Sequence, residues 1–272
     1  MKLLTLNCHS WMEENTEEKI KIIANTIKEK DYDVIALQEV NQSIEGKLAF
    51  NSIKEDNFAL VLLKVLDSLG CRAYKMVWDF SHIGYDRYEE GVCIITKHKI
   101  EEDYSFFVSK AKDKNFWKTR KVVGASLKIK EEIVDFYSCH LGWWQDEEEP
   151  FKAQVDQLLK NIRKDRLTFL MGYFNNSGFI RNEGYDYLIE KDRKDTFSMA
   201  EDSDDGITVK GKIDGWDLNK SNLRLDLILT NKKVDVKHSK VIFNGTNKPI
   251  VSDHYGVEIE VLMGKNERKD IT

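Results

Sequence analysis

Apolar, strand-like runs in this chain repeatedly end in strongly polar residues. The run 2–6 leads into Asn7, and the run 33–37 ends in Gln38 and Glu39. The later clusters of this kind are His140, 172–176, Asp226 and 252–254. A lone polar residue at a strand end is usually a cap or a surface group. Six such clusters at the exits of core strands instead favour one site built at the end of a sheet.

The periodicity of apolar residues predicts many strands and few helices. Helical spacing is found around residues 20–27, 59–69 and 151–162. Strand patterns cover 2–6, 33–37, 74–79, 91–96, 104–108, 121–127, 133–140, 167–171, 225–229, 234–243 and 256–262. No linker divides the chain, so we expect one domain over 1–263 with two packed sheets, outer helices and a polar tail over 264–272. Residues 196–222 read as a long irregular loop, which in a compact domain is usually functional.

Composition narrows the class of protein. The chain has 272 residues, 41% of them hydrophobic, and a formal net charge of −5. A negative net charge makes a long nucleic-acid substrate less expected, because proteins bind nucleic acids largely by neutralising the phosphates with positive charge. Four cysteines without a CxxC pair argue against a zinc or redox site, and Cys8, Cys93 and Cys139 fall in apolar runs where burial is expected. We expect a cytoplasmic protein without a membrane partner, since no apolar run reaches the ~18 residues of a membrane span and no secretion signal opens the chain.

The order of the motifs resembles the endonuclease/exonuclease/phosphatase superfamily. The residues that carry the resemblance are Asn7, Gln38-Glu39, Ser138-Cys-His140, Gly172-x-Phe-Asn175, Arg224-Leu-Asp226 and Ser252-Asp253-His254. The resemblance implies an α+β fold, a four-layer αββα sandwich of two packed, mostly antiparallel sheets flanked by helices. It also implies hydrolysis of a phosphoester with Mg²⁺, for which Mn²⁺ could substitute.

The resemblance further implies a role for each motif residue. Asn7, Glu39 and Asp253 would hold the metal, for which hard oxygen ligands are suited. His140 and His254 would donate hydrogen bonds to the phosphate, with Asp226 orienting one imidazole. Asn175 would place the attacking water or a phosphate oxygen.

Tyr173 departs from the family pattern Gly-Asp-Phe-Asn, in which the Asp is the presumed base for the attacking water. A phenol titrates near pH ~10 and a carboxylate near ~4, so Tyr173 is a poor base at neutral pH. Losing a positioned base typically costs ~10²–10⁴ in rate. We therefore predict that this chain hydrolyses phosphoesters poorly, either because Tyr173 is a substitution in an active scaffold or because the chain is a natural variant.

Two stretches are more specific, Leu-Thr-Leu-Asn-Cys-His-Ser-Trp-Met-Glu-Glu over 4–14 and Asp-Val-Ile-Ala-Leu-Gln-Glu-Val-Asn-Gln over 33–42. They resemble the maltose 6′-phosphate phosphatases of Gram-positive bacteria, which implies a small phosphorylated sugar as substrate. Aromatic side chains near the expected site could pack on sugar faces, and arginines could clamp phosphate. Each could equally be core packing or surface charge. The candidates for substrate contacts are Trp11, Trp143, Trp144, Trp216, Arg87 and Arg120.

Three alternatives remain open from the sequence. A nuclease would need a basic groove with stacking aromatics. A phospholipid or sphingomyelin phosphodiesterase would favour a secretion signal or an exposed apolar hairpin. A non-catalytic sugar-phosphate binder is compatible with Tyr173. The oligomeric state cannot be predicted.

Overall fold

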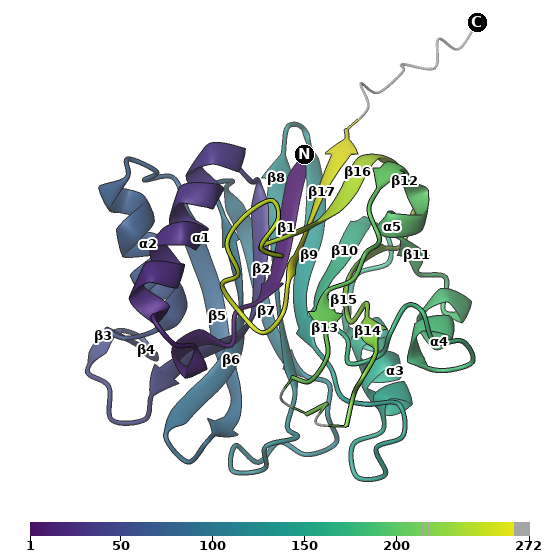
Figure 1. Cartoon of the computed structure of the whole chain (residues 1–272), viewed down its shortest axis with the longest axis horizontal. Helices are drawn as coiled ribbons and strands as arrows, with labels where there is room; N and C mark the ends of the chain where they lie inside the picture. The colour runs from purple at the N-terminus through teal and green to yellow at the C-terminus, as the bar shows by residue number, and fades with distance from the viewer. Residues whose placement is uncertain (214, 217, 264–272) are drawn as a thin grey trace, which may run out of the picture.

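The computed structural model describes residues 1–213, 215–216 and 218–263. Two large sheets pack face to face, with helices on their outer surfaces (Figure 1). The expected tail over 264–272 lies outside the described residues. Within the described part of the chain, no helix is both long and apolar enough to cross a bilayer.

The first sheet has seven strands and begins with the N-terminal strand near its centre. Its order is β12 (Ala200–Ser203), β16 (Asp235–Ile242), β17 (Gly256–Leu262), β1 (Lys2–Asn7), β2 (Val34–Ser43), β6 (Tyr88–Thr96) and β5 (Lys75–Gly84). The β1–β2 and β12–β16 pairs are parallel, and the other neighbours are antiparallel.

The second sheet has six strands and one parallel pair, β9–β10. Its order is β11 (Lys194–Asp195), β15 (Asp226–Thr230), β10 (Leu167–Tyr173), β9 (Glu132–His140), β8 (Lys121–Ile129) and β7 (Ile100–Phe107). Two short hairpins lie apart from the sheets: β3 (Leu48–Phe50) with β4 (Ile53–Lys54), and β13 (Val209–Lys210) with β14 (Asn222–Leu223).

Helices cover both outer faces (Figure 1). They are α1 (Thr16–Lys30) and α2 (Phe58–Ser68) on the first sheet, with α3 (Phe151–Asn161) and α4 (Gly184–Glu190) on the second; α5 (Thr196–Met199) and a 3-10 turn, η1 (Ser10–Met12), are shorter. Asn57 caps α2 by accepting from the Leu60 amide, and Gly70 follows the helix with a φ of 86° that favours glycine.

The strands alternate their side chains between two cores, which explains the four layers. Leu3 and Val34 point between the sheets, whereas Leu4 and Ile35 point toward α1 and α2. A third core joins the second sheet to α3 and α4. Strands buried on both faces read as continuous apolar runs, and burying each such side chain contributes about 1.5–3 kcal/mol. The αββα sandwich implied by the resemblance is confirmed.

One expectation was wrong. Residues 196–222 are not irregular throughout, because they contain α5, β12, β13 and the start of β14. These elements have two to four residues each, too few to show a period in the sequence.

Candidate active site

The polar clusters meet at one end of the sandwich because of the strand directions. Asn7 ends β1, His140 ends β9 and Tyr173 ends β10. Asp226 begins β15, which runs antiparallel to β10 and pairs with it so that Tyr173 lies opposite Asp226. This end lies at the bottom of Figure 1, away from the N-terminus.

Local distortions of the backbone orient the side chains of the candidate site. The β2–β6 ladder shifts register between Leu37 and Val40, and Glu39 in that bulge has a φ of 54°. Asn175 has a φ of 52°. Bulges and left-handed residues of this kind concentrate at functional sites, where they redirect side chains. Gly172, with a φ of 145°, has no room for a Cβ, which would lie 2.0 Å from the Cys139 carbonyl oxygen.

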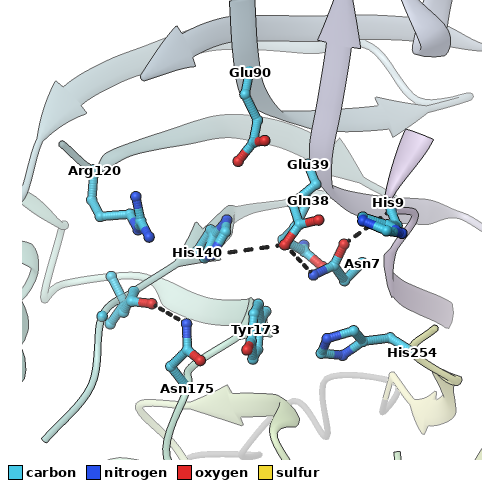
Figure 2. Close-up of polar contacts among 12 residues, drawn as sticks. Asn7, His9, Gln38, Glu39, Glu90, Arg120, His140, Tyr173, Asn175 and His254 are labelled. Carbon is cyan, nitrogen blue, oxygen red and sulfur yellow. Dashed lines mark hydrogen bonds and ion pairs between the residues drawn. The ribbon is translucent and has the colours of Figure 1, made fainter. Parts of the chain in front are cut away.

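Glu39 is the central carboxylate of the candidate metal site. Asn7 Nδ2 donates to Glu39 Oε1 at 2.7 Å, and His140 Nε2 lies 4.0 Å from the same oxygen (Figure 2). Burial and then the charge of Asp253 raise the pKa of Glu39. A carboxylate whose ionisation is disfavoured by a neighbouring carboxylate, and which accepts from an amide, belongs to a donor set that fits a divalent cation.

His9 and Glu13, which the sequence reasoning did not single out, flank Asp253. His9 Nδ1 lies 2.8 Å from Glu13 Oε1 and 3.8 Å from Asp253 Oδ1. Burial opposes charge on His9, but the hydrogen bond to Glu13 and the charge of Asp253 prevail and raise its pKa to about 9. The side-chain oxygen Oδ1 of Asn7 accepts from the backbone N–H of His9 at 3.1 Å, so Asn7 presents Nδ2, not Oδ1, to Glu39.

Asp226 and His254 form a buried pair. Asp226 Oδ2 and His254 Nδ1 are 2.8 Å apart. Because a carboxylate only accepts, Nδ1 carries the hydrogen and Nε2 is left for a ligand. Burial lowers the pKa of His254, but the charge of Asp226 and its hydrogen bond outweigh that and raise it to about 9. His254 is therefore a cation at neutral pH, suited to stabilising a phosphate.

His140 carries the opposite electrostatic character. Burial, followed by the charge of Arg120, holds its pKa well below the ordinary value. Arg120 is itself buried, and its Nη1 donates to the carbonyls of Trp117 and Thr119 at 2.7 and 3.2 Å. A neutral imidazole and a fixed guanidinium thus lie side by side (Figure 2).

Tyr173 stands between the two histidines. Its ring centroid lies 5.0 Å from that of His140 and 4.5 Å from that of His254. Burial, and then the charge of Glu39, raises the pKa of the phenol well above its usual range. Trp216 Nε1 donates both to the Tyr173 hydroxyl at 3.1 Å and to Asn175 Oδ1 at 2.9 Å. The phenol therefore stays protonated and cannot accept a proton from water.

A pocket of about 420 Å³ joins Glu39, Arg120, His140, Tyr173 and Asn175 to further side chains, and we call it the site pocket; Asn7, Asp253 and His254 are not among the residues that line it. It is lined by Glu39, His82, Gly84, Tyr85, Glu90, Trp117, Arg120, His140, Trp143, Tyr173, Asn175 and Gly215. Ligand sites commonly have volumes of about 300–1,000 Å³. His82, Glu90 and Trp117 come from other strands and loops than the motifs. A sequence signal was present near Glu90, since Arg87, three residues earlier, is one of the predicted substrate contacts.

Three of the predicted substrate contacts lie elsewhere. Trp11 donates to the Asp56 carbonyl and packs on Phe58, beside α2. Trp144 packs against Phe151 and Tyr187 in the outer core. Arg87 lies on the exposed β5–β6 turn, with its guanidinium over the Tyr88 ring.

The comparisons agree with this geometry. The model of the Endonuclease/Exonuclease/phosphatase family matches residues 10–254. This chain therefore belongs to that family, whose enzymes generally use divalent metals. No curated protein sequence matches the chain.

Solved structures are similar over nearly the whole chain. An endonuclease/exonuclease/phosphatase family protein from Leptotrichia buccalis C-1013-b is 42% identical, with a TM-score of 0.91 over 97% of this chain and 100% of that one. The mannosyl-6-phosphatase Bt3783 of Bacteroides thetaiotaomicron VPI-5482 is 17% identical, with a TM-score of 0.69 over 97% and 100%. Truncated Caenorhabditis elegans TDP2 is 17% identical, with a TM-score of 0.62 over 96% and 97%. The last two likenesses show the fold alone.

Proposed function

We propose that this chain is a Mg²⁺-dependent phosphomonoesterase scaffold for a phosphorylated sugar, with maltose 6′-phosphate as the leading candidate. The observation that carries the proposal is the continuity of the site pocket, which extends from Glu39 and His140 to Trp117 and Trp143. One end is suited to a metal-bound phosphate and the other to an apolar face. A distant structural relative bears the name mannosyl-6-phosphatase, which supports testing sugar phosphates first.

The chain's own residues divide the work of phosphoester hydrolysis. Glu39, Asn7 and Asp253 would hold the cation, Asn7 by orienting the Glu39 carboxylate. When bound, a divalent cation lowers the pKa of a coordinated water and offsets phosphate charge. His254 donates from Nε2 to a phosphate oxygen and stabilises the charge that develops there.

Arg120 and Asn175, which flank strands β8 and β10 of the second sheet, would position the phosphate. Arg120 is held rigidly by two backbone carbonyls, so its remaining N–H groups are preorganised for an anion. Asn175 Nδ2 donates to the Leu141 carbonyl at 2.8 Å, which fixes the amide beside Tyr173. Residue 173, two positions before Asn175, is a protonated phenol where the family pattern has a carboxylate, so the proton of the attacking water has no acceptor there.

That phenol gives a second candidate function, a binder that holds a sugar phosphate without cutting it. The nuclease alternative is disfavoured by charge, because Arg120 is the one Lys or Arg among the described residues that line the site pocket.

The test is phosphate release with Mg²⁺ from a panel of maltose 6′-phosphate, glucose 6-phosphate, a DNA duplex and a choline phospholipid. The panel is run with this chain and with Tyr173→Asp. We expect release from sugar phosphates, slow for the chain as it is and fast for the variant. Cleavage of DNA alone would overturn the assignment. Tight sugar-phosphate binding with no turnover by either form would favour the binder.

A further inference from the structure

The half of the site pocket that lies beyond the phosphate groups has two chemically different walls. One wall is aromatic and consists of Trp117, Trp143 and Tyr85; we call it the aromatic wall. The other carries His82 and Glu90, which we call the acceptor pair. The carboxylate of Glu90 also lies within 4.8 Å of the ligand atoms of Glu39 and His140, so Glu90 borders the candidate metal site. His82 and the aromatic wall have no part in the metal site described above.

The aromatic wall is a supported but open surface. Trp117 and Trp143 contact each other edge to face, with ring centroids 5.8 Å apart and planes at 63°. Gly215 packs against Trp143, since a Cβ there would lie 2.7 Å from Cζ2. Trp117 nevertheless leaves 51% of its surface exposed. A large exposed aromatic at the edge of a pocket suits a partner with an apolar face.

The acceptor pair is buried and held by the sheet. His82 and Glu90 face each other across β5 and β6, next to a register shift in that ladder. His82 Nδ1 lies 3.2 Å from the Thr119 carbonyl, which only accepts, so Nδ1 carries the hydrogen and Nε2 is an acceptor. Burial, and then the charge of Arg120, lowers the pKa of His82 to about 3, which keeps the ring neutral.

The gap between the two acceptors suits a ligand with several donors. His82 Nε2 and Glu90 Oε1 are 3.6 Å apart, too far for a direct hydrogen bond. A cation between them is disfavoured by the buried guanidinium of Arg120. Among the described residues, Arg120 Nε and Trp143 Nε1 are buried donors without a hydrogen-bond partner. The pocket therefore offers acceptors, donors and a flat apolar surface within one enclosure (Figure 2 shows Arg120 beside His140 and Glu90 above them).

We propose that this half of the site pocket is a subsite for a pyranose ring, which packs on Trp117 and Trp143 while two neighbouring hydroxyls donate to His82 and Glu90. A sugar ring combines an apolar face with hydroxyls that both donate and accept, which matches the two walls. The inference rests on the proposed function, because it places the sugar of a phosphorylated substrate whose phosphate lies at Arg120 and His140.

The test measures equilibrium binding and does not depend on turnover. Titration calorimetry with Mg²⁺ compares maltose 6′-phosphate with glycerol 3-phosphate, which has a phosphate and hydroxyls but no ring. Two variants are used, Trp117→Ala and Glu90→Gln, with Phe50→Ala as a control. Phe50 is an aromatic of the β3–β4 hairpin with 49% of its surface exposed, close to the exposure of Trp117. The truncation at Trp117 alters an exposed side chain, so that variant will fold even if the buried change at Glu90 disturbs the sheet.

We expect each site variant to raise the Kd of maltose 6′-phosphate about tenfold or more, the equivalent of about 1.4 kcal/mol. The same variants should change the Kd of glycerol 3-phosphate less than about twofold. Phe50→Ala should leave the Kd of both ligands unchanged. Equal losses for both ligands, or no loss for the sugar, would overturn the subsite.

Two further outcomes separate the subsite from the proposed function. A wild-type chain that binds the sugar phosphate no more tightly than glycerol 3-phosphate refutes the subsite even if phosphate is released. A ring-dependent difference in Kd without phosphate release from any substrate, even by Tyr173→Asp, supports the subsite and refutes the phosphatase. A nucleoside 5′-monophosphate that binds better than the sugar phosphate would show that the aromatic wall takes a base instead.

Discussion

Replacing Tyr173 with Asp should raise the rate of phosphoester hydrolysis strongly. Position 173 lies between His140 on β9 and Asp226 on β15, paired with both through the sheet. A carboxylate at this position can accept the proton that the buried phenol cannot. The shorter side chain also vacates the space that the ring occupies between the two imidazoles, 4.5 and 5.0 Å from their centroids.

The two consequences of the substitution have opposite signs. A positioned general base contributes about 10²–10⁴ in rate, which is about 3–5 kcal/mol of activation free energy. Removing a large buried side chain costs about 2–5 kcal/mol of folding free energy, and the hydrogen bond from Trp216 is lost as well. We therefore expect kcat/KM to rise about 10²-fold or more while the thermal midpoint falls.

The assay is initial phosphate release from maltose 6′-phosphate with saturating Mg²⁺, alongside a thermal melt of each variant. Tyr173→Asn is the matched control, because it removes the ring without supplying a base. If Asn accelerates the reaction as much as Asp, relief of crowding and not basicity limits the rate. If folded Tyr173→Asp is no faster than the unchanged chain, the argument about the missing base is wrong.

Three further outcomes follow from the site. Glu39→Gln should abolish the Mg²⁺-dependent rise in melting temperature and reduce turnover at least about 10²-fold; an unchanged metal shift would place the cation elsewhere. Arg120→Met, which keeps most of the buried volume, should raise KM for sugar phosphates about tenfold or more, and an unchanged KM would remove Arg120 from the phosphate site. His254 has a pKa near 9, above its ordinary 6.5. Its protonated ring therefore stabilises the fold fully below pH 6.5 and no longer does so above pH 9. In EDTA the free energy of unfolding should therefore fall by about 3 kcal/mol across that window. A fall on acidification to pH 6, or a slope unchanged in Asp226→Asn, would contradict the pairing.

The sequence predicted the main strands and most of the site because both are local in the chain. Buried strands read as apolar runs, and Asn7, His140 and Tyr173 each follow directly from such a run. Strand direction then forces their convergence. The short helices α4 and α5 were not predicted, since seven and four residues carry too little periodicity.

The remaining part of the site could not be predicted because it depends on which strands are neighbours. His82 faces Glu90 only through the β5–β6 register, and Trp117 meets Trp143 across two loops. The same limitation affected the tryptophans near the motifs. Trp144 lies four residues from His140 along the chain but turns into the outer core.

The most direct test of the account is a crystal structure of this chain with Mg²⁺ and maltose 6′-phosphate, since slow hydrolysis should trap the intact substrate. We predict a cation on Glu39, a phosphate within hydrogen-bonding distance of Arg120 and His254, and a sugar ring against Trp117 and Trp143. A ligand bound outside the site pocket, or a cation that makes no contact with Glu39, would contradict the central claim that one pocket binds metal, phosphate and sugar together.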